Sequence, residues 1–235
     1  MGLVAALQIS AGAQETLKPS GNVITRSVTV KSFSAIKASG LFDVILTQGI
    51  SEGVKVETDD NLQYLIEVSN NLDTLVIDEP KLHNNNINFT NADGEHSKRQ
   101  HFKVYITFKN INCLDVQTIG NVSADAALTF NTIDVKDKSV GNIKMSLTAN
   151  KLKIYNKGVG GVTLSGKVED AIVMNTGVGS FNGEDLVVQN MQITNTGVGH
   201  ADVNVVKALI VKDSFLGKVK NSGSAKTIKM NGQEI

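Results

Sequence analysis

Apolar and polar residues alternate along short stretches in the second half of the chain. Examples are Ile133-x-Val135, Leu152-x-Ile154 and Leu209-x-Val211. A period of two sends successive side chains to opposite faces of a strand, so one face can be buried. Each stretch is therefore expected to form a strand of about five residues.

These stretches belong to an internal repeat that starts at residue 114. Each copy has an aliphatic residue directly before a shared glycine and another apolar residue two positions after it. The glycines recur every 18 to 21 residues, at Gly120, Gly141, Gly160, Gly179, Gly199 and Gly217. A glycine at this place is typical of a tight corner that needs a positive φ or a close backbone approach.

A strand repeat of this length predicts a solenoid. Short strands cannot bury an apolar face alone, whereas coils stacked on one another can. A propeller blade needs roughly 40 residues or more, and helical solenoids lack a period of two. Unequal coil lengths favour a right-handed coil over a left-handed helix of strict hexapeptides. We predict an all-β fold: a right-handed, single-stranded parallel β-helix with coils of about 19 residues.

A column of amide and carboxyl side chains lies four residues before the shared glycine. Its members are Asp137, Asn156, Asn175, Asn195 and Asp213. Stacked coils would align these side chains, and amides could then hydrogen-bond along the axis as they do in cross-β ladders. The column could instead be a line of ligand-binding groups, but its change from Asn to Asp towards both ends favours a structural ladder.

Residues 22–110 are strand-rich but lack the regular repeat. Their β-branched, alternating segments predict strands at 26–30, 43–47, 54–58, 64–68, 74–78 and 103–108. No linker-like composition separates this part from the repeats. We expect one domain over 22–235, with irregular first coils at 22–110 and regular Gly-Val-Gly coils at 111–220.

Residues 1–13 have features of a partial secretory signal. Residues 3–9 are apolar, and Ala11-Gly12-Ala13 has the small-x-small pattern of a cleavage site, although no basic residue precedes Lys18. The alternative is an ordinary apolar N-terminal strand or helical turn. With the polar, β-rich body, the pattern favours export to the periplasm, the outer-membrane surface or the extracellular space.

Composition excludes several classes of protein. The 23 basic residues balance 23 acidic ones, which argues against nucleic-acid binding. No apolar run approaches the length of a membrane-spanning helix, about 18 residues. The single cysteine, Cys113, excludes an internal disulfide framework and a cysteine-cluster metal site. We expect Cys113 to be a buried structural thiol rather than a nucleophile.

Segment 32–80 carries a resemblance to a known family. The pattern consists of Phe33, Ile36, Gly40, Asp43-Val44-Ile45, Gln48-Gly49 and Asp60-Asn61-Leu62. It resembles the opening of the bacterial family called putative auto-transporter adhesin, head GIN domain, and segment 103–123 with the Gly-Val-Gly coils is similar to that family's second half. The resemblance implies a right-handed β-helix, export in a Bacteroidetes-type envelope, a role in surface adhesion and no catalytic residues.

Residues 82–101 interrupt the strand pattern with polar side chains. The possible ligands among them are His83, Asp93, Glu95, His96 and His101. Histidine and carboxylate groups bind zinc or nickel, but no pair here has a recognised ligand spacing. We predict that this segment is an exposed loop without a metal. If the protein binds a ligand through a loop, this segment is the best-placed one.

Other candidate chemistry is explained by the fold. Gly158-Val159-Gly160-Gly161 could cradle a phosphate, but no helix follows it and the motif recurs, so corners are favoured. The acidic doublets Glu169-Asp170 and Glu184-Asp185 do not converge when the repeats are aligned, which favours solvated turn charges over a catalytic carboxylate pair. His200 follows a corner glycine and is expected to be exposed.

The function most consistent with these features is non-enzymatic. We expect an exported cell-envelope protein that needs no cofactor and binds a surface ligand, protein or glycan, through a rigid β-helix. One alternative is a polysaccharide lyase or hydrolase on the same fold, which rests on analogy alone. Another is an assembly scaffold that forms homo-oligomers, since exposed coil ends invite edge-to-edge pairing.

Overall fold

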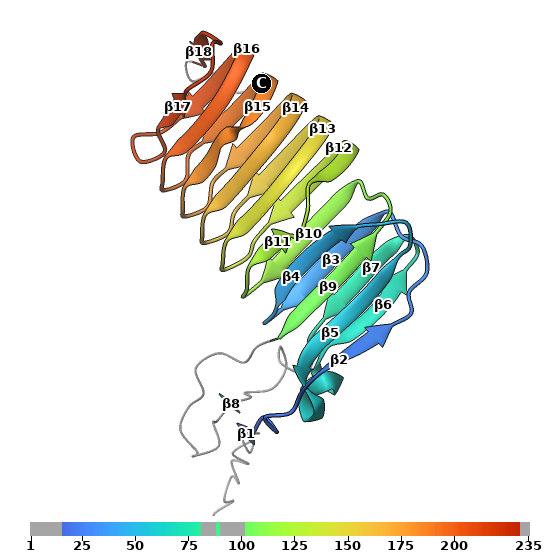
Figure 1. Cartoon of the computed structure of the whole chain (residues 1–235). Helices are drawn as coiled ribbons and strands as arrows, with labels where there is room; N and C mark the ends of the chain where they lie inside the picture. The colour runs from blue at the N-terminus through green and yellow to red at the C-terminus, as the bar shows by residue number, and fades with distance from the viewer. Residues whose placement is uncertain (1–15, 81–87, 90–101, 231–235) are drawn as a thin grey trace, which may run out of the picture.

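The chain folds into an elongated stack of β-strands (Figure 1). The computed structural model describes residues 16–80, 88–89 and 102–230. Parallel strands with a spacing of about 19 residues build a β-solenoid of about 6 turns, which confirms the predicted solenoid. The signal-like residues 1–13 lie outside the described residues, as does segment 82–101 apart from its strand at 88–89.

Five long strands form the regular part of the solenoid. They are β12 (Leu128–Asp137), β13 (Ile143–Asn156), β14 (Val162–Asn175), β15 (Phe181–Asn195) and β16 (Ala201–Asp213). Each pairs in parallel with the next, and β13 and β14 stay in one register from Ile143↔Val162 to Asn156↔Asn175. The predicted length of about five residues is wrong here, because the hydrogen-bonded ladder continues through the bend in each coil and merges two predicted strands.

The first half supplies shorter strands. They are β2 (Val23–Val28), β3 (Ala35–Gly40), β4 (Asp43–Gln48), β5 (Gly53–Asp59), β6 (Glu67–Asn71), β7 (Thr74–Asp78), β9 (Lys103–Phe108), β10 (Cys113–Thr118) and β11 (Val122–Ala124). β3 pairs in parallel with β10, and β4 with β11. β10 and β11 in turn pair with β12 and β13, which joins these shorter strands to the regular coils. The pairs β2–β5, β5–β9 and β6–β7 are antiparallel, so the N-terminal end departs from the purely parallel prediction.

Short strands lie at both ends of the stack. β1 (Thr16–Leu17) and β8 (Asn88–Phe89) pair in parallel as a separate small sheet. β17 (Val219–Asn221) and β18 (Thr227–Lys229) both pair with β16 at the C-terminal end.

The prediction of a strand at 64–68 is wrong at its start. A 3-10 helix, η1 (Asp60–Leu65), takes up this segment before β6 begins at Glu67. Leu62 and Leu65 are both buried, and three residues make one turn of a 3-10 helix. The spacing of these two leucines therefore suits a helical turn that places both side chains in the core.

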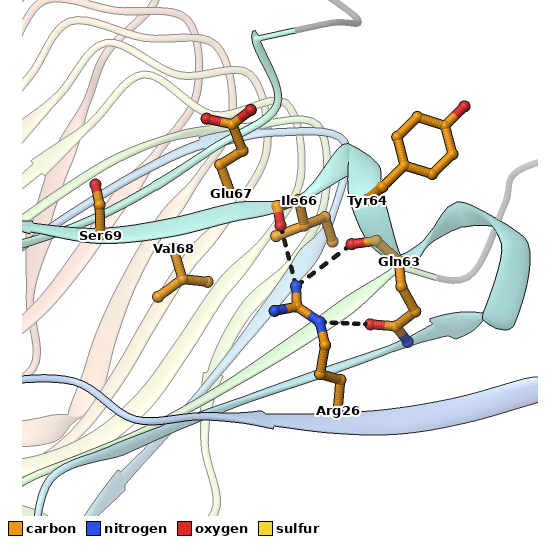
Figure 2. Close-up of a pocket in the computed structure, with 7 residues that line it drawn as sticks. All are labelled: Arg26, Gln63, Tyr64, Ile66, Glu67, Val68 and Ser69. Carbon is orange, nitrogen blue, oxygen red and sulfur yellow. Dashed lines mark hydrogen bonds between the residues drawn. The ribbon is translucent and has the colours of Figure 1, made fainter.

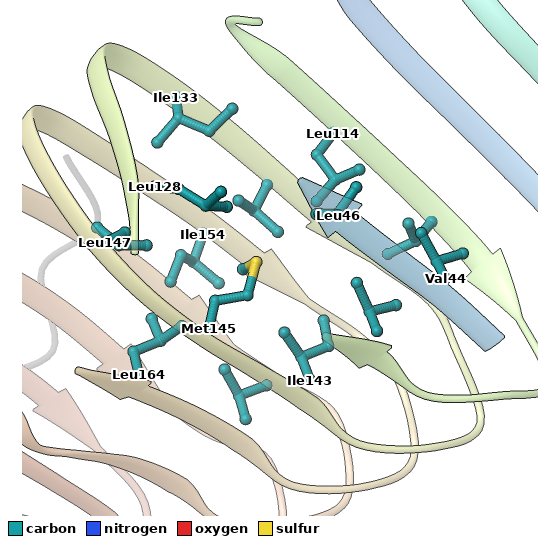
Figure 3. Close-up of a cluster of buried hydrophobic side chains, with 14 of the residues drawn as sticks. Val44, Leu46, Leu114, Leu128, Ile133, Ile143, Met145, Leu147, Ile154 and Leu164 are labelled. Carbon is teal, nitrogen blue, oxygen red and sulfur yellow. The ribbon is translucent and has the colours of Figure 1, made fainter. Parts of the chain in front are cut away.

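The core is a column of aliphatic side chains along the solenoid axis (Figure 3). Alternate residues of each strand point inward, so that Ile133, Leu152, Ala171, Met191 and Leu209 stack coil upon coil. Burying such a side chain contributes roughly 1.5–3 kcal/mol, which makes stacking the main source of stability.

Candidate functional site

Each regular coil turns at a shared glycine, where two conditions exclude a side chain. A positive φ is found at Gly141, Gly160, Gly179 and Gly199. At Gly160, where φ is +142°, a Cβ atom would also collide with the main-chain oxygen of Gly141 one coil away. At Gly120 and Gly217 a Cβ atom would strike main-chain oxygens of a neighbouring coil in the same way. Close stacking of the coils therefore depends on these glycines.

An aliphatic residue stands on the outside of every corner. Parallel bridges stack Ile119, Val140, Val159, Val178 and Val198 in this order. Leu216 comes next, because its carbonyl accepts a hydrogen bond from the amide of Gly199 over 3.1 Å. The four valines are 49–50% exposed, Ile119 is 54% exposed and Leu216 59%. We call these six residues the corner ridge.

The corner ridge is held by hydrogen bonds to neighbouring coils and is flanked by glycines. The amide of Val159 donates to Ser139 O over 2.8 Å, and the amide of Gly160 donates to Val178 O over 2.8 Å, so the corner is tied to both neighbouring coils. A glycine follows every ridge residue, and glycines also precede Val159, Val178 and Val198. Soluble monomers rarely expose a long contiguous apolar patch, and such patches mark interaction sites.

Beneath the corner, asparagine side chains of successive coils are hydrogen-bonded to one another. Asn156 Nδ2 donates to Asn175 Oδ1 over 2.8 Å, and Asn175 Nδ2 donates to Asn195 Oδ1 over 2.7 Å. All three residues are buried. Asn156 Oδ1 also accepts the amide of Gly158 over 2.8 Å. The three amides therefore link neighbouring coils and support the corner from inside.

The two aspartates of the same column lie in different surroundings. Asp137 is buried, and its Oδ1 accepts the amide of Ser139 over 2.9 Å. Burial raises the pKa of Asp137, although these hydrogen bonds oppose the change. Burial also opposes ionisation of Asp213, but its ion pair with Lys229, at 3.1 Å, and its hydrogen bonds outweigh this and lower its pKa. Among the described residues, no side-chain hydrogen bond links either aspartate to the asparagines.

A second polar column, which the sequence analysis missed, follows the corner glycines. Asp43 Oδ1 accepts the amide of Asn121 over 2.6 Å, and Asn121 Oδ1 accepts the amide of Asn142 over 3.0 Å. Asn142 Oδ1 in turn accepts the amide of Gly161 over 2.9 Å. Asn121 and Asn142 both directly follow a shared glycine, and this common position was the available signal.

Glu79 is the most perturbed carboxyl group of the described residues. It is fully buried at the end of β7, where Oε2 accepts the amide of Leu41 over 2.6 Å and Oε1 has no hydrogen-bond partner. Burial raises its pKa from an ordinary 4.5 to about 7. Gly40 makes room for this side chain, because a Cβ atom there would lie 2.8 Å from Oε2.

Lysines gather beside the corner ridge. Lys136, Lys138 and Lys157 line a shallow cavity of about 410 Å³ together with Tyr155 and the aspartates Asp134 and Asp137. None of the ion pairs within the described parts of the chain includes these three lysines. Lysines therefore outnumber carboxylates on the surface next to Val140 and Val159, and one of the two carboxylates, Asp137, is buried.

A larger open cavity lies at the N-terminal end (Figure 2). It measures about 540 Å³ and is lined by residues of β2, η1 and β6. Arg26 donates from Nε to Gln63 Oε1 over 3.2 Å and from Nη2 to the carbonyls of Gln63 and Ile66, over 3.3 and 3.1 Å. Arg26 thus ties β2 to η1 and to the start of β6, and its contacts close the end of the solenoid.

The expectation that Cys113 is buried is wrong. The residue is half-buried, because the alternation of β10 turns Leu114 into the core and Cys113 outward. Burial still raises the pKa of the thiol, which disfavours the nucleophilic thiolate.

The remaining candidate residues do not converge. Asp170 lies beside Asn190, whose amide donates to it over 2.9 Å, and His200 is exposed after its corner glycine. The residues His83, Asp93, Glu95, His96 and His101 lie outside the described residues. Within the described part of the chain, no group of three or more His, Cys, Asp or Glu side chains is arranged to hold a metal ion. No helix there has the length and apolar character needed to cross a bilayer.

Three solved structures share this architecture. The crystal structure of a putative adhesin from Bacteroides fragilis is 26% identical, with a TM-score of 0.73, and the match covers 91% of this chain and 99% of that one. A putative lipid binding protein from Parabacteroides distasonis is 16% identical, covering 92% and 100%, with a TM-score of 0.59. A putative adhesin from the same species is 17% identical, covering 92% and 100%, with a TM-score of 0.57. At this level of sequence identity, the last two matches show only that the fold is shared.

No curated protein matches the chain. A family model matches residues 32–225, which contain the first coils, all the Gly-Val-Gly corners and the corner ridge. The match covers most of the chain and includes the motifs on which the resemblance rested. The chain therefore belongs to the family described as putative auto-transporter adhesin, head GIN domain.

Proposed function

We propose that this protein is an exported, non-enzymatic component of the cell envelope that recognises a surface through the corner ridge. The observation that carries the proposal is the row of six aliphatic side chains, each about half exposed, on one edge of a rigid stack. The family supports a role in adhesion, and its solved relatives come from Bacteroides and Parabacteroides.

The ridge has the properties of a contact surface rather than of core side chains that the fold fails to bury. The amide and carbonyl of each of the four ridge valines are hydrogen-bonded to neighbouring coils, so exposure of these side chains costs the fold no such contact. Because successive coils repeat the same corner, every ridge residue faces a partner in the same orientation. A rigid surface loses little conformational entropy on binding, which favours affinity.

Binding to intact cells tests the proposal. We expect the full chain to bind saturably to bacterial or host cells, and Val159→Asp with Val178→Asp to weaken binding at least tenfold. Ile50→Asp is the matched control, since Ile50 is 96% exposed but lies away from the ridge. Saturable binding that the ridge variant leaves unchanged would refute the ridge as the contact surface, and no binding to any cell type would refute recognition itself.

A further inference from the structure

The charges beside the corner ridge are of one sign. Two residues before the ridge positions lie Gln117, Lys138, Lys157, Thr176, Thr196 and Ser214. Two residues after them lie Asn121, Asn142, Gly161, Ser180, His200 and Lys218. Neither flanking column contains an acidic residue. Lys138, Lys157 and Lys218 are exposed, and no ion pair within the described ranges includes them.

Three carboxylates close to the ridge are engaged within the protein. Asp137 is buried and accepts the amide of Ser139, Asp213 pairs with Lys229, and Asp43 accepts the amide of Asn121. The ridge and its two flanking columns therefore present only aliphatic, cationic and neutral groups to a partner, while the half-buried Asp134 lines the adjoining cavity.

An aromatic residue stands at one end of this edge. Phe215 is 87% exposed and directly precedes Leu216. Aliphatic and aromatic side chains that face the same way as lysines are the combination by which peripheral proteins bind anionic membranes.

The shape of the ridge favours a planar partner. Neighbouring coils lie about 4.8 Å apart, so six stacked corners form a line of roughly 24 Å. The ridge contains no tryptophan, tyrosine or arginine, the residues that dominate protein–protein hot spots. A flat bilayer can contact all the corners at once.

We propose that the corner ridge docks on the surface of an anionic lipid bilayer. The six aliphatic side chains and Phe215 enter the headgroup region, while Lys138, Lys157 and Lys218 lie against anionic headgroups. This inference rests on the proposed function and replaces the protein or glycan partner expected from the sequence with a lipid surface.

Vesicle co-sedimentation of the full chain tests the inference. We expect binding to vesicles of equal parts phosphatidylglycerol and phosphatidylcholine, at least tenfold weaker binding to phosphatidylcholine alone, and loss of affinity in 0.5 M salt. Val159→Asp with Val178→Asp should weaken binding at least tenfold. Val159→Thr with Val178→Thr should weaken it several-fold and keeps the β-branched shape if the charged variant fails to fold. Ile50→Asp should bind normally.

Charge reversal supplies the second arm. Lys138→Glu with Lys157→Glu should weaken binding at least tenfold, whereas Lys151→Glu with Lys167→Glu makes the same change in net charge at exposed sites away from the flanking columns and should have a smaller effect. Three outcomes would overturn the inference: no vesicle binding, binding indifferent to both ridge pairs, or a ridge-dependent self-association that replaces vesicle binding. If vesicles fail while ridge-dependent cell binding persists, the lipid partner is refuted and the proposed function stands.

Discussion

The regular coils and the N-terminal end are held together in different ways. In β13–β16, the same contacts recur in every coil: a corner glycine under a carbonyl, and an aliphatic residue outside. At the N-terminal end, each contact occurs once, as when Gln63 Nε2 donates to the carbonyls of Ile24, Val56 and Thr58. Repetition thus builds a row of equivalent corners, and single contacts close the end of the stack.

The largest effect is expected at a corner glycine. Gly160→Ala should lower the free energy of unfolding by roughly 3–5 kcal/mol, because it adds backbone strain and a collision with Gly141 O. Gly53→Ala is the matched control in the first half, since a Cβ atom there meets nothing within 4 Å. Urea unfolding measures both, and equal stability of the two variants would contradict this account of the corners.

The next largest effect is expected in the asparagine ladder. Asn175→Ala leaves Asn156 Nδ2 and Asn195 Oδ1 without their partners in the core, and should cost about 2–4 kcal/mol. Asn150→Ala removes a similar bond to Asn131, of 2.9 Å, but at an exposed site, and should cost less than about 1 kcal/mol. A small loss of stability for Asn175→Ala in chemical denaturation would show that the ladder is dispensable.

A smaller effect, set by pH, is expected at the N-terminal end. The pKa of Glu79 is about 7 in the folded chain and near 4.5 ordinarily, so the folded state favours the protonated acid. The contribution of Glu79 to stability is therefore greatest below pH 4.5 and is lost as the pH rises to about 7. Glu79→Gln should reduce this pH-dependent loss of unfolding free energy by roughly 1–3 kcal/mol. If the free energy of unfolding changed equally with pH in the unmodified chain and in Glu79→Gln between pH 5 and 8, the assignment to Glu79 would be contradicted.

The repeated features of the fold could be predicted from the sequence because each occurs several times. The intervals between glycines give the coil length, and the column of Asn156, Asn175 and Asn195 appears at a constant offset. Glu79 and Gln63 could not be found in this way, since their partners lie far away in the chain, such as Ile24 for Gln63. The antiparallel pairs of the first half likewise leave no periodic signal.

The corner ridge was visible in the sequence only as an aliphatic position. An aliphatic residue is ordinarily expected to face the core, but Val159 lies on the outward-facing phase of the alternation, in which Asn156 and Gly158 are buried. The row of exposed aliphatic side chains forms only when the coils are stacked, because each member then lies beside the next.

A fluorescent label at the ridge tests the central claim most directly. An environment-sensitive dye would be attached to Val178→Cys, and for comparison to Thr148→Cys, an exposed site elsewhere on the solenoid, both in a Cys113→Ser background. On addition of anionic vesicles or of cells that bind the protein, we predict a blue shift at position 178 and none at position 148. An unshifted label at position 178 while the protein is bound would contradict the claim that the corner ridge is the contact surface.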